Sequence, residues 1–198
     1  MRIISGTRRG RKLAFAPNSD IKPLTDRIKE SLFGIIGPEI PEADVLDLYA
    51  GCGSFGIEAL SRGAARAVFV DSNPEALSCI LKNLQHADLI SQAEAVRLDA
   101  FSYITHAARQ GITFRIIFLD PPFEQGENGE FFAKAGECAN DIACILQESG
   151  LMIMRIPTHT QPTFSSGQVS EIRRKKYGRS SIVFYRKDTD EIQSGSTA

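Results

Sequence analysis

The segment around Gly51 is the first place where residue types and spacing could do chemistry. Gly51, Gly53 and Gly56 form a GxGxxG pattern after an apolar run and before a helical segment, the context in which this pattern is informative. Glycine lets the backbone turn sharply and approach a ligand closely, and a helix N-terminus offers unpaired N–H groups to an anion. Asp71 follows Gly51 by twenty positions, where a carboxylate can accept hydrogen bonds from both hydroxyls of a ribose. The pattern predicts a site for an adenosine-type cofactor.

The glycine pattern alone does not choose between a dinucleotide and S-adenosylmethionine. Asp47 stands four residues before Gly51, at the end of the apolar run. A carboxylate there would repel a pyrophosphate and attract the ammonium and sulfonium of S-adenosylmethionine, although it could also only stabilise the turn. Asp99 follows the third expected strand, where adenine would lie and could donate its exocyclic amine. These acids favour S-adenosylmethionine.

A second chemical motif, Asp120-Pro121-Pro122-Phe123, directly follows the apolar run FRIIFL. Two prolines fix the backbone and remove two N–H donors, so the turn is rigid and presents acceptors: the Asp120 carboxylate and the Pro121 carbonyl. Two fixed acceptors can hold an amino group by both hydrogens and aim its lone pair at a methyl donor, and Phe123 offers a surface on which a base can stack. We expect this turn to lie beside the glycine loop, at the point where the order of the strands reverses.

From Val45 onward, apolar runs typical of strands alternate with amphipathic segments typical of helices. This alternation predicts a parallel sheet covered by helices on both faces. Segment 176–186 alternates without an intervening helix and predicts an antiparallel hairpin at the sheet edge, and segment 2–13 predicts a short strand or hairpin. The expected strands are Val45–Tyr49, Ala67–Val70, Ala95–Leu98, Phe114–Leu119 and Leu151–Ile156, and the expected helices are one ending at Ile36 after an N-cap at Thr25, Ile57–Arg62, one from Pro74 to about His86 after an N-cap at Asn73, Tyr103–Arg109, and one within Glu130–Gln147.

The net charge of −1 hides a strong separation of charge. Residues 1–29 hold eight Lys and Arg against two Asp, and residues 171–187 hold seven against one Glu, so each segment carries +6. The remainder must carry about −13. Two basic arms beside an acidic body are typical of nucleic-acid binding, or of a merely solvated surface.

Composition excludes several other classes of protein. The four cysteines have no CxxC spacing, and no His stands at a zinc-like offset, so neither a metal site nor a disulfide framework is expected. The basic start lacks the apolar stretch of a signal peptide, and no apolar run is long enough to span a bilayer.

The motifs together resemble the class I methyltransferases, and Asp120-Pro121-Pro122-Phe123 resembles the (D/N)PP(Y/F) turn of the branch that methylates amino groups. Five segments resemble, in order, the bacterial RsmD family over about residues 2–187: IISGTRRGRKL, KPLTDRIKESLF, VLDLYAGCGSFGIEALSRGA, FLDPPF and KKYGRSSIVFY. Members of that family methylate the N2 amine of a guanine in 16S ribosomal RNA. Lys22, Leu24 and Cys52 depart from the residues usual in the family, but no required chemical group is lost.

The resemblance implies an α/β, Rossmann-like class I methyltransferase fold: a seven-stranded, mostly parallel sheet with helices on both faces, an antiparallel C-terminal hairpin and a small N-terminal β-hairpin arm. It implies a basic arm over residues 1–22, a methyltransferase domain over 23–187 and a disordered tail over 188–198. We expect a cytoplasmic monomer without metal or membrane contact, which uses S-adenosylmethionine and acts on 16S rRNA or the assembling small ribosomal subunit. The implied catalytic residues are Asp120, Pro121, Pro122 and Phe123; the implied cofactor contacts are Asp47, Tyr49, Gly51, Gly53, Asp71, Ser72, Asp99 and Ala100; and the residues expected to contact RNA are Arg8, Arg9, Arg11, Lys12, Arg173, Arg174, Lys175, Lys176 and Arg179.

Three alternatives remain at the level of sequence. A dinucleotide-dependent oxidoreductase would share the glycine pattern and Asp71, but would leave the Asp120 turn and the basic arms unexplained. A non-catalytic RNA-binding factor would bind RNA without transferring methyl groups. Methylation of adenine N6 or cytosine N4 in DNA uses the same chemistry, because all three bases carry an amine. The role of Glu58, in the helix after the glycine loop, is left open between the site and plain helical surface.

Overall fold

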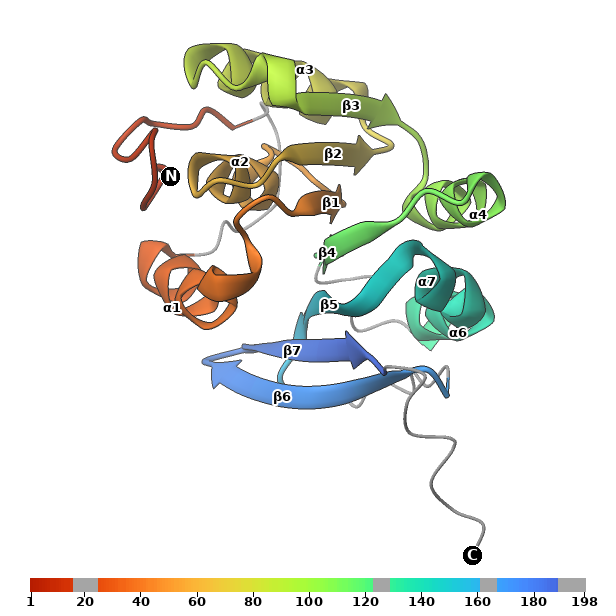
Figure 1. The fold of residues 1–198 in the computed structure, drawn as a ribbon. Helices are drawn as coiled ribbons and strands as arrows, with labels where there is room; N and C mark the ends of the chain where they lie inside the picture. Colours follow the sequence, from red (N-terminus) through yellow and green to blue (C-terminus); the bar gives the residue numbers. More distant parts are fainter. Residues whose placement is uncertain (16–24, 123–128, 161–166, 189–198) are drawn as a thin grey trace, which may run out of the picture.

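The computed structural model describes residues 1–15, 25–122, 129–160 and 167–188 (Figure 1). Its strands are β1 (Asp44–Leu48), β2 (Arg66–Asp71), β3 (Ala93–Arg97), β4 (Phe114–Leu119), β5 (Leu146–Pro157), β6 (Val169–Tyr177) and β7 (Ser180–Lys187). Its helices are α1 (Asp26–Ile36), α2 (Ser54–Ser61), α3 (Pro74–His86), α4 (Ala100–Gln110), α6 (Gly129–Glu137) and α7 (Ala139–Ile145), with short 3-10 turns η1 (Gly37–Glu39) and η2 (Ile90–Gln92).

A seven-stranded sheet in the order β3-β2-β1-β4-β5-β7-β6 forms the centre of the molecule. The pairs β1–β2, β2–β3, β1–β4 and β4–β5 are parallel, whereas β5–β7 and β6–β7 are antiparallel. The chain winds outward from β1 to β3 and then returns to place β4 on the other side of β1. The mostly parallel sheet, its C-terminal hairpin and the reversal beside the glycine-bearing strand are confirmed as predicted.

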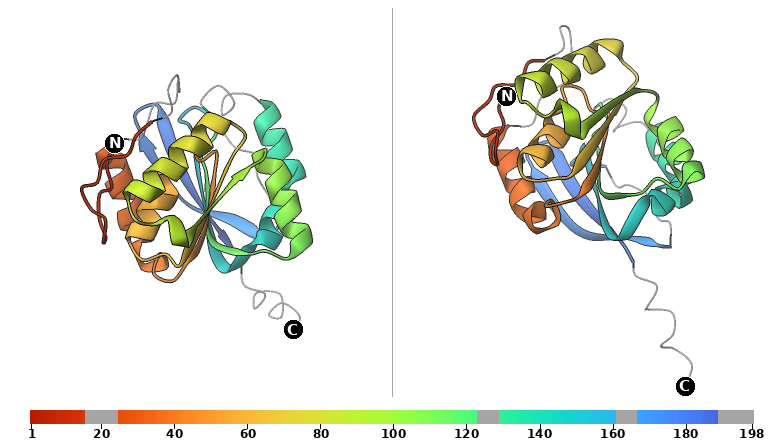
Figure 2. Two further views of the ribbon diagram at one scale, coloured as in Figure 1. Left: turned by 90° about the horizontal axis from the view of Figure 1, so that it is seen from above. Right: turned by 45° about the horizontal axis from the view of Figure 1, so that its top comes forward.

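Each face of the sheet has its own hydrophobic core. Helices α1, α2 and α3 cover one face, and α4, α6 and α7 cover the other (Figures 1 and 2). The central strands β1 and β4 are buried almost throughout, which is why they read as continuous apolar runs rather than as an alternating pattern.

The helix starts follow from local chemistry. The side chains of Thr25, Asn73 and Asp99 accept hydrogen bonds from backbone N–H groups in the first turns of α1, α3 and α4, as N-cap residues do. Pro74 occupies the first position of α3, where a missing N–H costs nothing. The caps predicted at Thr25 and Asn73 are confirmed.

Several predicted extents differ from the structure. Helices α2 and α4 begin at Ser54 and Ala100, three residues before the predicted starts, β3 begins at Ala93 rather than Ala95, and two helices, α6 and α7, lie where one was expected. The largest differences are in β6 and β5. β6 begins at Val169, well before Lys176, because this edge strand is mostly polar and charged and carries no apolar alternation to reveal it. β5 begins at Leu146 rather than Leu151 and contains Ser149 with a φ of 57°. The register against β4 shifts between Phe114 and Ile116. A bulge of this kind breaks the apolar run at its polar residues.

The N-terminal segment forms a tight hairpin with one antiparallel bridge, between Arg2 and Lys12. Ile3 and Leu13 are buried in the core on the α1–α3 side, so the hairpin packs on the domain, although its predicted extent to residue 22 lies partly outside the described residues. Lys22, Leu24 and the predicted tail beyond Asp188 also lie outside them. Within the described segments, no helix has the length and apolar character to cross a membrane.

Candidate active site

The carboxyl ends of three neighbouring strands bring three carboxylates to one edge of the sheet. Asp47 pairs in register with Phe69 of β2 and with Phe118 of β4. Asp71 and Asp120 each follow their phenylalanine by two residues. Because alternate residues of a strand point to the same face, both acids lie on the face that carries Asp47. The turn at Asp120 therefore lies beside the glycine loop, as the sequence predicted.

The backbone of the glycine loop turns through conformations that favour glycine. Gly51 and Gly53 have φ of 58° and 78°, and Tyr49 has φ of 58°. Positive φ is uncommon in a bulky residue and is often found at functional sites. Gly56 serves packing, because a Cβ added there would lie 2.3 Å from a ring carbon of Phe69. The loop is thus bent toward the site, and α2 lies close against β2.

Asp47 is fully buried beneath this loop. One carboxylate oxygen accepts the N–H of Gly56 at 2.9 Å, and the other has no hydrogen-bond partner among the described residues. Burial, together with the nearby charges of Asp120 and Asp71, raises the pKa of Asp47 well above its usual range, against the hydrogen bond from Gly56. A buried acceptor without a donor is unfavourable, and a cationic ligand group would satisfy it.

The other predicted cofactor residues lie along the same edge. Asp71 accepts the N–H groups of Gly51 and Asn73, both at 2.9 Å, so it fixes the loop besides facing the site. Asp99 is exposed and caps α4 through one oxygen. Ser72 is exposed and Ala100 is buried. The structure therefore brings the predicted set to one edge, and it gives Asp71 and Asp99 structural bonds of their own.

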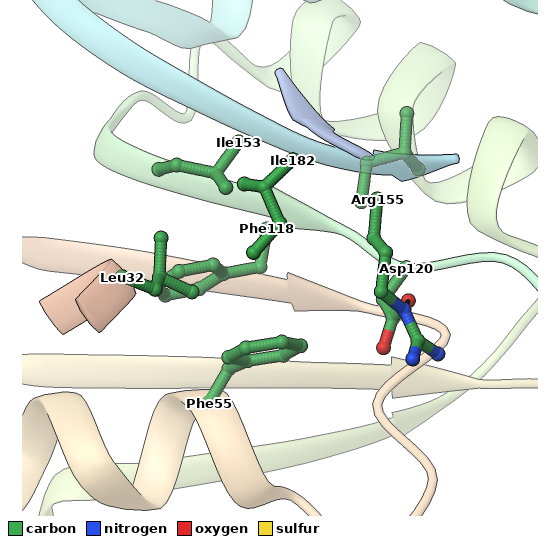
Figure 3. Close-up of a pocket in the computed structure, with 8 residues that line it drawn as sticks. Leu32, Phe55, Phe118, Asp120, Ile153, Arg155 and Ile182 are labelled. Atoms are coloured by element: carbon green, nitrogen blue, oxygen red, sulfur yellow. Dashed lines mark hydrogen bonds and ion pairs between the residues drawn. The ribbon is translucent and has the colours of Figure 1, made fainter. Parts of the chain in front are cut away.

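Asp120 makes an ion pair with Arg155, whose Nε donates to the carboxylate (Figure 3). Arg155 follows Ile153 of β5 by two residues, and Ile153 pairs with Phe118, so Arg155 lies beside Asp120 on the same face. The side chain of Arg155 is only 8% exposed and that of Asp120 only 16%. Burial raises the pKa of Asp120, and Arg155 opposes that rise by its charge and its hydrogen bond.

A small, mainly apolar pocket lies next to this ion pair. Besides Asp120 and Arg155, residues of α1, α2, β4, β5 and β7 line it, with Phe55 and Phe118 stacked at a centroid distance of 4.9 Å (Figure 3). Pro121 is buried and Pro122 exposed, and Phe123 lies outside the described residues. The Asp120 end of the candidate site is thus a largely buried ion pair in mainly apolar surroundings. The remaining residues that line the pocket are Leu32, Leu119, Ile153 and Ile182.

Glu58, whose role the sequence left open, is the centre of a buried network. It is fully buried, contacts Lys29 at 3.0 Å and Arg62 at 2.8 Å, and accepts the backbone N–H groups of Ile4 and Ser5. Lys29, also fully buried, donates to backbone carbonyls of the arm and of Ser54, where α2 begins. This network fastens the N-terminal hairpin to the helix that follows the glycine loop.

In the N-terminal hairpin, two of the basic residues predicted to contact RNA are bonded to the rest of the protein, and two are exposed to solvent. Arg8 donates to the carbonyl of Ala87 at 2.7 Å, just past the end of α3. Arg11 donates to the carbonyl of His86 and makes a 2.8 Å ion pair with Asp88. Arg9 and Lys12 are exposed. Arg8 and Arg11 therefore hold the hairpin against α3.

The C-terminal basic residues divide in the same way. Arg174 pairs with Glu171 at 2.7 Å, and Lys175 donates to the Ser31 hydroxyl of α1 at 3.3 Å. Among the basic residues predicted to contact RNA on and beside this strand, Arg173, Lys176 and Arg179 are exposed.

Sequence reasoning missed Arg155 and Lys29. A signal existed for the first, because Arg155 is the charged residue within the apolar run Leu151–Ile156, and a charge inside a buried strand needs a partner. Lys29 gave no such signal, since its burial depends on where α1 packs.

This architecture, with the glycine loop and the Asp120 turn on adjacent strands, defines a class I methyltransferase fold. A solved structure titled "Putative methyltransferase yhhF from Escherichia coli" has a TM-score of 0.77 and 31% identity, and the match covers 96% of this chain and 98% of that one.

The chain belongs to the family described as conserved hypothetical protein 95, whose model matches residues 1–186. A protein of Bacillus subtilis named "Putative rRNA methyltransferase YlbH" is 35% identical over 187 residues, which are 94% of this chain and 99% of that protein. "Ribosomal RNA small subunit methyltransferase D" of Escherichia coli is 39% identical over 126 residues, which are 64% of this chain and 62% of that protein. The match thus spans less than two thirds of the Escherichia coli protein, and the resemblance to the RsmD family is confirmed.

Proposed function

We propose that this protein transfers a methyl group from S-adenosylmethionine to the N2 amine of a guanine in small-subunit ribosomal RNA. The observation that carries the proposal is the adjacency of the glycine loop and the Asp120 turn on paired strands, with the Asp120 N–H 3.4 Å from the Leu48 carbonyl. Names of relatives support rRNA as the substrate, and the resemblance to their family supports guanine N2. A ribosomal substrate favours a cytoplasmic enzyme, and we retain the expectation of a monomer.

The residues at the first half of the site fit S-adenosylmethionine. The unpartnered oxygen of Asp47 is an acceptor for the ammonium of the methionine moiety. Asp71, at the end of β2, can accept from the ribose hydroxyls through its remaining lone pairs, and Asp99 stands where adenine would bind. When bound, S-adenosylmethionine supplies an electrophilic methyl group on a sulfonium.

The second half of the site would hold the acceptor amine. The Asp120 carboxylate and the Pro121 carbonyl accept its two hydrogens, which directs the nitrogen lone pair toward the methyl carbon. The new N–C bond would form as the C–S bond breaks with its electrons going to sulfur, and the cationic nitrogen would then release its proton to water. Alignment of this kind accounts for up to about 7–11 kcal/mol of a barrier when fully realised, and the Asp120 charge stabilises the cationic nitrogen as it develops.

The basic residues would hold the RNA by its phosphates. The side chains of five basic residues are exposed and make no ion pair or hydrogen bond within the described part of the chain: Arg9 and Lys12 on the hairpin, and Arg173, Lys176 and Arg179 on the edge strand and its turn. Such contacts position a substrate without reading its sequence. They would offset the few kcal/mol, roughly, that a base costs to leave its stack.

The proposal is tested by incubating labelled S-adenosylmethionine with undermethylated small-subunit particles and mapping the modified base. We expect one guanine to gain a methyl group on N2 with the wild-type protein and none with Asp120→Ala. Calorimetric titration should show binding of S-adenosylmethionine and not of NAD. Binding of NAD alone, or RNA binding without any methyl transfer, would contradict the proposal.

A further inference from the structure

The ion pair between Asp120 and Arg155 places two charges in a mainly apolar pocket. Leu32, Phe55 and Phe118 line the same pocket as the pair, and both charged side chains are nearly buried (Figure 3). An isolated carboxylate in such a place tends to hold its proton. Burial does raise the pKa of Asp120, and Arg155 is the group that opposes the rise. The pair therefore decides whether Asp120 accepts hydrogen bonds only or also donates one.

Charged groups on the other elements around Asp120 do not replace Arg155. Asp47 of β1 and Asp71 of β2 are like charges at the same edge, and the charge of Asp120 itself raises the pKa of Asp47. Lys29 of α1 is occupied by Glu58 at 3.0 Å. Arg155 of β5 is thus the cation that the described residues place against Asp120.

The state of this carboxyl matters because nucleobases differ beside their amines. In guanine, the N2 amine is next to N1–H, so two donors stand side by side. In adenine and cytosine, the amine is next to a ring nitrogen with a lone pair. An ionised carboxylate only accepts, so it matches guanine and faces a repulsive lone pair in the other two bases. A protonated carboxyl, with one donor and one acceptor, would match adenine and cytosine instead.

We propose that Arg155 is a positioning residue that holds Asp120 as an acceptor-only carboxylate, and that this carboxylate selects guanine by accepting from N1–H as well as from the N2 amine. The inference rests on the proposed function, because it concerns the acceptor of the same methyl transfer. It adds a residue and a physical basis for choosing among the three amine-bearing bases.

The test compares the pH dependence of kcat/KM for methyl transfer to small-subunit particles among wild type, Arg155→Met and Arg155→Lys. Arg115→Met is the matched control, because Arg115 makes an ion pair with Glu39 near the opposite end of β4. On the acidic side of the pH profile, kcat/KM falls as Asp120 takes up a proton. Because Arg155 lowers the pKa of Asp120, we expect Arg155→Met to move this acidic limb to higher pH and to lower kcat/KM at neutral pH by about tenfold or more. Arg155→Lys should move the limb back toward that of the wild type, and Arg115→Met should leave it in place.

An acidic limb that does not move in Arg155→Met would overturn the inference while leaving the proposed function standing. Calorimetric affinity for S-adenosylmethionine should be unchanged in Arg155→Met, which separates an acceptor effect from damage to the cofactor half. A wild-type protein that transfers no methyl group would instead overturn the proposed function and, with it, this inference.

A second measurement needs no variant. Replacing the mapped guanine by 2-aminopurine keeps the amine but puts a lone pair at N1. The wild-type protein should then lose about tenfold or more in kcat/KM, as expected when a polar contact is replaced by a mismatch. Equal rates on the two bases would overturn guanine selection by Asp120.

Discussion

At the scale of single residues, the site is built from groups that are unfavourable without ligand. Asp47 is fully buried with one unpartnered oxygen, and Tyr49 holds a positive φ beside it. Burial and two nearby acids raise the pKa of Asp47, so its ionised form destabilises the protein at neutral pH. Because we propose that the unpartnered oxygen accepts from the cofactor, replacing Asp47 should change both the stability of the protein and its cofactor binding.

Asp47→Asn should stabilise the protein without cofactor and weaken its binding of S-adenosylmethionine. A raised carboxyl pKa means that the penalty is absent below the ordinary pKa, grows as pH rises between the ordinary and the raised value, and is complete above it. We expect a gain of about 1 kcal/mol in the free energy of unfolding at neutral pH, lost on acidification, and an affinity lower by roughly 10- to 100-fold. Urea unfolding at several pH values measures the free energy of unfolding, and calorimetric titration measures the affinity for S-adenosylmethionine.

Asp44→Asn, at the start of the same strand in an exposed pair with Arg66, is the control and should change stability by less than about 1 kcal/mol. Unchanged affinity in Asp47→Asn would argue against a contact with the ammonium.

At the scale of elements, the position of α2 sets the site, because the glycine loop leads directly into it. Its close approach to β2 depends on Gly56, and its attachment to the N-terminal hairpin depends on Glu58. The two residues act at one helix by different physics: one removes a steric obstacle, and the other satisfies buried charges and N–H groups.

Gly56→Ala should destabilise the protein by about 1–3 kcal/mol, because the new methyl group would overlap the buried ring of Phe69. Displacement of α2 should also weaken binding of S-adenosylmethionine. Gly34→Ala is the matched control: Gly34 is an exposed helical glycine of α1 with open space around it, so alanine should stabilise by about 0.5–1 kcal/mol. Thermal unfolding distinguishes the opposite signs, and the same sign for both would contradict the packing role of Gly56.

Glu58→Gln should lower the free energy of unfolding by about 3–5 kcal/mol, because it leaves Lys29 buried without its counter-charge. Hydrogen exchange should show the N–H groups of Ile4 and Ser5 losing protection. Glu130→Gln, in an exposed i,i+4 pair with Lys134, should cost less than about 1 kcal/mol. Similar losses for the two variants would mean that burial does not set the strength of this network.

At the scale of the whole molecule, the basic segments lie at two places on an acidic body. The N-terminal hairpin packs against α2 and α3, whereas β6 forms the far edge of the sheet (Figure 1). Several of their cations hold the protein together rather than facing solvent, so total charge overstates what RNA can contact. The exposed cations are therefore the residues to substitute in a test of RNA binding.

Arg9→Gln with Lys12→Gln should weaken RNA binding and flatten its dependence on salt, without a loss of stability. Each lost phosphate contact should reduce the slope of log K against log salt by about 0.7 for a single strand. Arg8→Gln is the informative comparison, because Arg8 bonds the end of α3, so it should lower thermal stability. An unchanged salt slope in the double variant would count against the hairpin as an RNA contact.

Much of this protein could be predicted from its sequence because the governing interactions are local. The caps at Thr25 and Asn73, the turn after β4 and the alternation of apolar runs with helices act over a few residues. The meeting of the two motifs also followed, because parallel strands have their carboxyl ends at one edge. The edge strand β6 was underestimated, since a solvated strand lacks apolar alternation.

Only the tertiary structure decided which charges are paired and buried. Asp120 and Arg155 are 35 residues apart, Lys29 and Ser54 are 25 apart, and Arg8 and Ala87 are 79 apart. No short-range pattern encodes such pairs, because each depends on which helix packs on which strand and on how much water that packing removes. The sequence by itself determined the strands, the turns and the chemical types present, and packing determined the environment that gives those groups their strength.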